Sequence, residues 1–108
     1  MAVLTKGDDA QIPYRLKKDG VTFAIDGGAT AKAVLTTLDR LTAISAIVTV
    51  DLAAAGSDLP NSLIIVKFTE IESAEITALG EALLEVQLDD GGKLTWTRQI
   101  TVRNGNIP

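Results

Sequence analysis

Two runs of alternating apolar and polar residues, joined by one short turn, constrain this chain more than any other feature. One phase of each run is apolar: Ala82, Leu84, Val86 and Leu88 in the first, and Leu94, Trp96, Ile100 and Val102 in the second. A period of two is typical of a strand that buries one face. The intervening Asp89-Asp90-Gly91-Gly92 tolerates the positive φ angles of a tight turn. The sequence therefore predicts a β-hairpin from Gly80 to Val102, with Trp96 buried beside Leu84 or Val86.

Length and composition narrow the possible functions. A chain of 108 residues is long enough for one hydrophobic core, so we expect a single domain over residues 1–108. It contains no cysteine and no histidine, which removes thiolate nucleophiles, disulfides and the commonest general base and metal ligand. We expect a protein that is not an enzyme and that uses no cofactor or metal.

The net charge of −4 argues against a surface that neutralises phosphates. The basic cluster Arg15, Lys17 and Lys18 leads into the Asp19-Gly20 turn and is interpreted as a solvated strand end. No apolar run is long enough for a signal peptide or a membrane span. We therefore expect no nucleic acid and no membrane among the partners, and synthesis in the cytoplasm.

Further alternation, bounded by turn residues, extends the prediction to the whole chain. The predicted strands cover residues 11–17, 21–25, 31–38, 44–52, 63–69, 81–88 and 94–102, and residues 1–10 are expected to form an extended arm. Pro13 cannot donate to a ladder, which places the first of these strands at a sheet edge. Thr69 and Glu72 fit a capping box, and Ile71, Ala74 and Ala78 have helical spacing before Gly80. About seven short strands with one short helix before the penultimate strand are typical of a β-sandwich.

The order of these features resembles the immunoglobulin-like domain of bacteriophage tail and baseplate proteins, most closely the N-terminal domain of the phage baseplate upper protein family. The shared features are Lys6-Gly7-Asp8-Asp9 before the first strand, the Asp19-Gly20 turn, the strand Ile64 to Phe68, a Thr-x-x-Glu segment with Ala74, the strand that begins at Gly80, the Asp90-Gly91 turn and the closing Thr101-Val102 strand. The family commonly has an aromatic residue two or three places after the glycine that corresponds to Gly80, whereas this chain has Ala82 and Leu83 there.

The resemblance implies an immunoglobulin-like β-sandwich that serves as a virion structural protein of a phage tail or baseplate. Its expected partners are other virion proteins and copies of itself, and the resemblance carries over no catalytic residue. A phage head decoration or fibre-anchoring protein is an alternative within the same class. A carbohydrate-binding β-sandwich is an alternative from another class.

Several clusters have a chemical interpretation and a structural one. Asp8-Asp9 and Asp89-Asp90 could ligate calcium, but adjacent Asp and Gly residues also form turns, and the ligand spacing of a calcium loop is missing. Asp26-Gly27-Gly28 lacks the Lys of a phosphate loop. Glu70, Glu72, Glu75 and Glu81 are expected on a solvated surface around the short helix. Tyr14 and Trp96 could stack on a sugar, but both fall in phase with core residues.

Four residues do not fit their strands' phases and are predicted to form an interface. Ile47, Ile65 and Leu83 fall on the polar phase of three strands, where aliphatic side chains would be exposed. Arg98 falls on an apolar phase, so we expect it at a rim or interface, paired with an acid.

Overall fold

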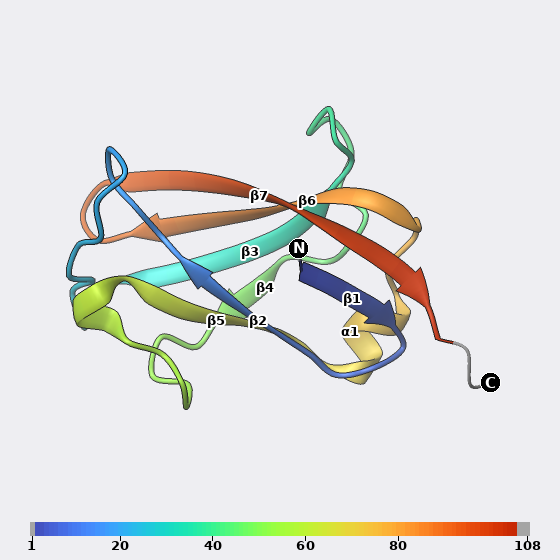
Figure 1. Ribbon diagram of the computed structural model, residues 1–108, viewed down its shortest axis with the longest axis horizontal. Coiled ribbons are helices and arrows are strands. Elements are labelled where there is room, and N and C mark those ends of the chain that lie inside the picture. The colour runs from blue at the N-terminus through green and yellow to red at the C-terminus, as the bar shows by residue number, and fades with distance from the viewer. Residues whose placement is uncertain (1, 106–108) are drawn as a thin grey trace.

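The computed structural model describes residues 2–105, and most of its regular structure is β-strand (Figure 1). The strands are β1 (Ala2–Lys6), β2 (Ala10–Arg15), β3 (Thr30–Thr36), β4 (Val48–Val50), β5 (Leu63–Phe68), β6 (Gly80–Asp89) and β7 (Lys93–Asn104), with a 3₁₀ turn η1 (Leu59–Asn61) and a helix α1 (Glu70–Ala74). The all-β class and the short helix before the penultimate strand are confirmed. Within residues 2–105, no helix has the length and apolar character needed to cross a bilayer.

The strands form two sheets, and both contribute to one core. The larger sheet has the order β1-β7-β6-β3-β4, in which only β1 and β7 are parallel, and the smaller sheet pairs β2 with β5. One cluster of buried side chains includes Leu35 and Leu84 from the larger sheet and Ile12, Val66 and Phe68 from the smaller. Figure 1 shows β2 and β5 on one side of this core and β3, β6 and β7 on the other.

The predicted hairpin is present. β6 and β7 pair from Gly80 opposite Val102 to Asp89 opposite Lys93, and Gly91 has a φ of 108° in the turn. Trp96 pairs with Val86, as predicted, but it is half-buried rather than buried. Leu94, predicted on the core face, is 38% exposed.

The capping box is also present. The Thr69 side chain accepts from the Glu72 amide at 3.2 Å, and the Glu72 carboxylate accepts from the Thr69 amide at 2.9 Å. The helix ends at Ala74, so the predicted helical spacing of Ile71, Ala74 and Ala78 is not continued to Ala78. The Ile71 side chain is exposed. The buried residues here are Ser73 within the helix and Ile76 beyond it.

The prediction of an extended arm at residues 1–10 is wrong for most of its length. β1 adds in parallel to β7, with Ala2 opposite Ile100 and Leu4 opposite Val102, and the Leu4 side chain is fully buried. This pairing joins the two ends of the chain, so no local pattern announces it. β2 follows after the turn that contains Gly7.

The predicted strand 21–25 does not form. Asp19 and Gly20 both have positive φ and close a tight turn in which Lys18 and Val21 exchange two backbone hydrogen bonds of 2.9 Å. Residues 22–25, which follow this bridge, pair with no strand. Instead, the Ile25 amide donates to the Leu59 carbonyl at 2.8 Å, and the Phe23 amide donates to the Ser62 hydroxyl at 3.4 Å.

The predicted strand 44–52 shrinks to the three residues of β4 because the chain bulges before it. Ala43 lies opposite Thr36, and Val48 lies opposite Ala33. An advance of three residues along β3 therefore corresponds to an advance of five residues along its partner. The Ser45 hydroxyl accepts from the Leu35 amide at 2.9 Å, where a regular ladder would use a backbone carbonyl. The two extra residues project outward, and Ile47 lies in this bulge.

Candidate interaction surfaces

Ile65 lies on the outer face of its strand, as predicted, but it is not exposed. Its neighbours Ile64 and Val66 are fully buried in the core, whereas Ile65 itself is only 7% exposed. A Cβ atom added to Gly56 would lie 3.8 Å from the Ile65 side chain, which places the loop before η1 over it. The prediction that Ile65 is part of a free surface is wrong, because this loop forms a small second apolar contact with it.

Ile47 and Leu83 are placed on the outside, as predicted, though to different extents. Ile47 is 69% exposed in the bulge before β4. Leu83 is half-buried on the outer face of β6, between Thr36 of β3 and Gln99 of β7.

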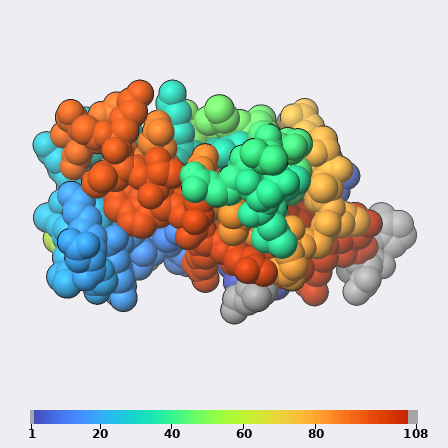
Figure 2. All heavy atoms as spheres, turned by 90° about the horizontal axis from the view of Figure 1, so that it is seen from above, coloured from blue at the N-terminus to red at the C-terminus, as the bar shows by residue number. Residues whose placement is uncertain are grey.

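The segment of residues 37–47 carries three exposed aliphatic side chains. Leu38 is 53% exposed and Leu41 is 83% exposed, and both belong to the same excursion as Ile47. Figure 2 shows this segment, in teal and green, projecting over the orange strand β6. Exposed aliphatic side chains mark a contact surface where they form one patch, and these three lie within ten residues of the chain.

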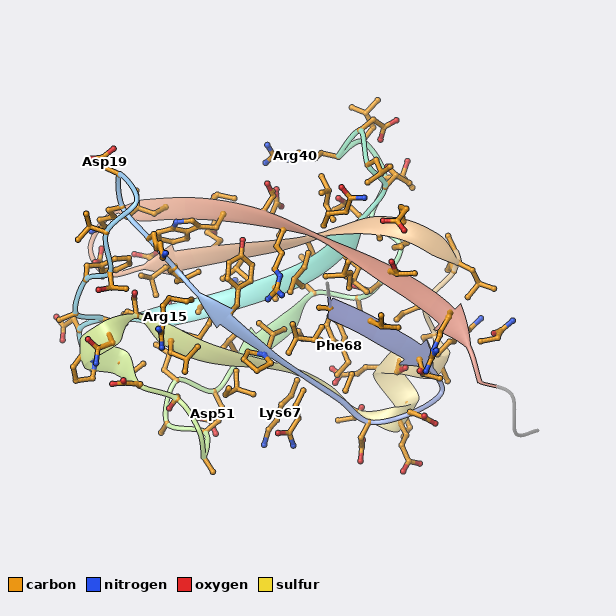
Figure 3. The ribbon with its side chains drawn as sticks, viewed as in Figure 1. Arg15, Asp19, Arg40, Asp51, Lys67 and Phe68 are labelled. Carbon is orange, nitrogen blue, oxygen red and sulfur yellow. The ribbon has the colours of Figure 1, made fainter. Side chains whose placement is uncertain are left out.

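Hydrogen bonds and one ion pair hold the tip of this segment in place. The Asp39 carboxylate accepts from the Thr37 hydroxyl at 2.5 Å and from the Leu41 amide at 2.9 Å. These bonds, the Thr37 hydroxyl first, lower the pKa of Asp39. Arg40, labelled in Figure 3, has a φ of 64° and contacts Glu85 of β6 at 2.6 Å. The aliphatic side chains are therefore presented by an anchored turn.

Arg98 is half-buried at the rim, but its partners differ from the prediction. Its guanidinium donates to the Pro13 carbonyl at 2.9 Å and lies 5.8 Å from the centre of the Tyr14 ring. Within residues 2–105 it makes no ion pair, so the predicted acid partner is wrong. Burial raises the pKa of Tyr14, and the nearby positive charge of Arg98 partly opposes that shift.

A slot of about 370 Å³ opens beside Arg98, between the edges of the two sheets. Its walls are Ala2 and Val3 of β1 and Gln11, Ile12 and Pro13 of β2, with Arg98 of β7 as its charged residue. We call this the β1–β2 slot. It contains no acidic side chain among its lining residues.

Tyr14 and Trp96, considered above as a stacking platform for a sugar, do not form such a platform. Tyr14 is 7% exposed and belongs to the core cluster. Trp96 stacks on Phe23 with ring centres 5.9 Å apart, and its indole N–H donates to the Lys17 carbonyl at 2.9 Å. One face and the polar edge of Trp96 are thus already in use.

The acidic pairs behave as turn and cap residues. Asp9 accepts from the Glu70 amide at the start of α1, Asp26 from the Gly28 amide and Asp89 from the Gly91 amide. Glu81 accepts from Gln99 at 2.6 Å and from Thr101 at 3.0 Å, and these bonds lower its pKa. No group of three or more potential metal ligands occurs in the described part of the chain.

Sequence reasoning did not identify Val3, Leu38 and Leu41 as surface residues of interest. Leu38 and Leu41 flank the Asp39-Arg40 turn, and large aliphatic residues beside a turn signal would have been a usable clue. Val3 gave no such signal, because its strand depends on pairing with the far end of the chain. No protein-family model and no curated protein matches this sequence.

Proposed function

We propose that this protein is a non-enzymatic structural component of a phage tail or baseplate, and that it acts through protein–protein contacts. The observation that carries the proposal is the anchored 37–47 segment, which presents Leu38, Leu41 and Ile47 to solvent. The sequence resemblance described above supplies the virion context. A head decoration or fibre-anchoring role would use the same surface.

We infer that the fold is an immunoglobulin-like β-sandwich. The support is a five-stranded and a two-stranded sheet that share one core, with a β-hairpin at the end of the chain. A rigid β framework suits assembly, because it holds a docking segment in a fixed orientation before contact. Less conformational entropy is then lost when the neighbour binds.

The expected interface combines the 37–47 segment with Leu83 and the outer face of β6. Burying one such aliphatic side chain is worth about 1.5–3 kcal/mol. The surrounding outer-face positions are polar, including Glu85, Gln87 and Thr97. An apolar centre with a polar surround is the usual anatomy of a protein interface.

The test is incorporation of the tagged full chain into purified phage particles. We expect the double variant Leu41→Lys and Ile47→Lys to fold normally and to be lost from the particles. Ile71→Lys is the matched control, because Ile71 is 73% exposed on α1, and Figure 1 shows α1 on the lower side of the fold and the tip of this segment on the upper side. It should be incorporated like the wild type.

Three outcomes would contradict the proposal: absence of the wild-type chain from particles, normal incorporation of the double variant, or equal loss of the Ile71→Lys control. Gold labelling seen by electron microscopy on heads alone would favour the decoration role. Specific binding on a glycan array, lost on Trp96→Ala, would favour a carbohydrate-binding module instead.

A further inference from the structure

We propose that the β1–β2 slot binds an extended peptide segment of another protein, which pairs with the free edge of β1 and places an acidic side chain on Arg98. This surface is separate from the 37–47 segment. It rests on three observations: an open strand edge, a neighbouring edge that is closed at Pro13, and a half-buried cation with no acidic partner.

The open edge belongs to β1. The Thr5 carbonyl accepts from the Ser73 hydroxyl at 3.1 Å, so the backbone groups of Thr5 point away from β7. The backbone groups of successive residues in a strand point alternately to its two sides. The amide and carbonyl of Val3 therefore point away from β7, like those of Thr5. The Thr5 carbonyl accepts from the Ser73 hydroxyl and from the Asp8 amide, whereas Val3 has no backbone partner on this side within residues 2–105.

The facing edge belongs to β2 and is closed at Pro13. The Leu16 amide donates to the Ser62 carbonyl on the β5 side, so odd-numbered residues of β2 present their backbone groups to the free side. Pro13 has no N–H there, and its carbonyl is taken by Arg98. The Lys17 carbonyl is taken by Trp96. A segment entering the slot thus finds the ladder groups of Val3 on one wall and those of Gln11 on the other.

Arg98 determines the charge that this segment should carry. One of its N–H groups is used on Pro13, and the guanidinium lies 5.8 Å from the centre of the Tyr14 ring. The remaining donors have no carboxylate within the described residues. Arginine pairs with carboxylates through short, charge-assisted hydrogen bonds, so an Asp or Glu side chain on the incoming segment is the complementary group.

A peptide fits these features better than a compact ligand does. Addition of a strand to an open edge uses main-chain hydrogen bonds for affinity and side-chain contacts for specificity. The slot offers both, because Val3 supplies the edge while Ile12 and Arg98 supply an apolar and a charged contact.

The experiment uses the full chain, labelled with ¹⁵N, and the probe peptide acetyl-Thr-Val-Asp-Val-Thr-amide, with its Asp→Asn version as control. We expect the Asp peptide to shift the amide signals of Val3 and Gln11 and the side-chain N–H of Arg98. The Asn peptide should bind about fivefold more weakly, which corresponds to replacing one charge-assisted hydrogen bond with a neutral one.

Two variants separate the charge from the strand pairing. Arg98→Met keeps the aliphatic stem and should abolish the preference for Asp over Asn, whereas Arg15→Met removes the same charge from an exposed position of β2 and should preserve it. Val3→Pro removes the edge N–H and should weaken both peptides equally.

The proposal is overturned if neither peptide shifts Val3 and Gln11, or if both bind with equal affinity to the wild type. Shifts at these residues that appear on raising protein concentration without peptide would assign the slot to a second copy and also overturn it. The wild-type titrations alone decide the question if a variant fails to fold.

Discussion

Ser62 makes the sharpest prediction about stability. It is fully buried at the junction between η1 and β5, with a φ of 56° in the left-handed region. The Ser62 amide donates to the Leu59 carbonyl and is not available to the Leu16 carbonyl. The Leu16 carbonyl accepts from the Ser62 hydroxyl at 2.5 Å. The same hydroxyl accepts from the Phe23 amide. One side chain therefore joins three separate segments.

Ser62→Ala should lower the free energy of unfolding by about 2 kcal/mol, because it leaves the buried Leu16 carbonyl without a partner, a loss typically worth about 1–3 kcal/mol. The contact to Phe23, at 3.4 Å, adds little. Ser62→Gly loses the same hydrogen bonds but removes the strain of a side chain at positive φ. It should therefore be more stable than Ser62→Ala by about 1 kcal/mol.

Urea unfolding followed by Trp96 fluorescence measures both variants against the wild type. With an unchanged slope of about 1–3 kcal/mol per molar urea, the Ser62→Ala midpoint should fall by roughly 1 M. A loss below about 0.5 kcal/mol, the range of ordinary surface changes, would show that the Leu16 carbonyl finds another partner. A Ser62→Gly variant less stable than Ser62→Ala would refute the conformational part of the reasoning.

Two further predictions follow from the contacts of Ile65 and Glu81. Ile65→Lys should destabilise the fold by at least about 2 kcal/mol, because the loop containing Gly56 covers the side chain; a thermal midpoint equal to that of the wild type would show that this loop opens freely. Glu81 has a lowered pKa, so its contribution to stability is present above the unfolded-state value near 4.5 and is lost as the pH falls through the lower folded-state value. In a carboxyl NMR titration, Gln99→Ala should raise the Glu81 pKa toward 4.5, and an unchanged titration would show that the Gln99 hydrogen bond does not cause the shift.

Local patterns predicted the elements whose partners are close in sequence. The β6–β7 hairpin, the Asp19-Gly20 turn and the Thr69 capping box each depend on residues a few positions apart, and all three are present. The alternation of β5 was interpreted correctly as to phase, with Ile64 and Val66 in the core.

The errors arise where a distant residue or a side chain replaces the expected backbone partner. The Ser45 hydroxyl takes the place of a ladder carbonyl and produces the bulge that shortens β4. The Ser62 hydroxyl and the Leu59 carbonyl draw residues 21–25 away from any ladder. Ile65 was expected to be exposed because its strand phase carries no information about a loop that folds over the sheet.

The unusual position of Arg98 on an apolar phase follows from the unequal widths of the two sheets. The five-stranded sheet is wider than the two-stranded one that faces it, so the inward side of β7 is only partly covered. Along this strand, Ile100 and Val102 are buried, Trp96 and Arg98 are half-buried, and Leu94 is exposed. Trp96 and Arg98 have long side chains with polar ends; Arg98 donates to the Pro13 carbonyl on the free edge of β2, and Trp96 donates to the Lys17 carbonyl just after that strand. An aliphatic residue at position 98 would cover the core equally well, but it would leave the Pro13 carbonyl unpaired and the β1–β2 slot without its positive charge.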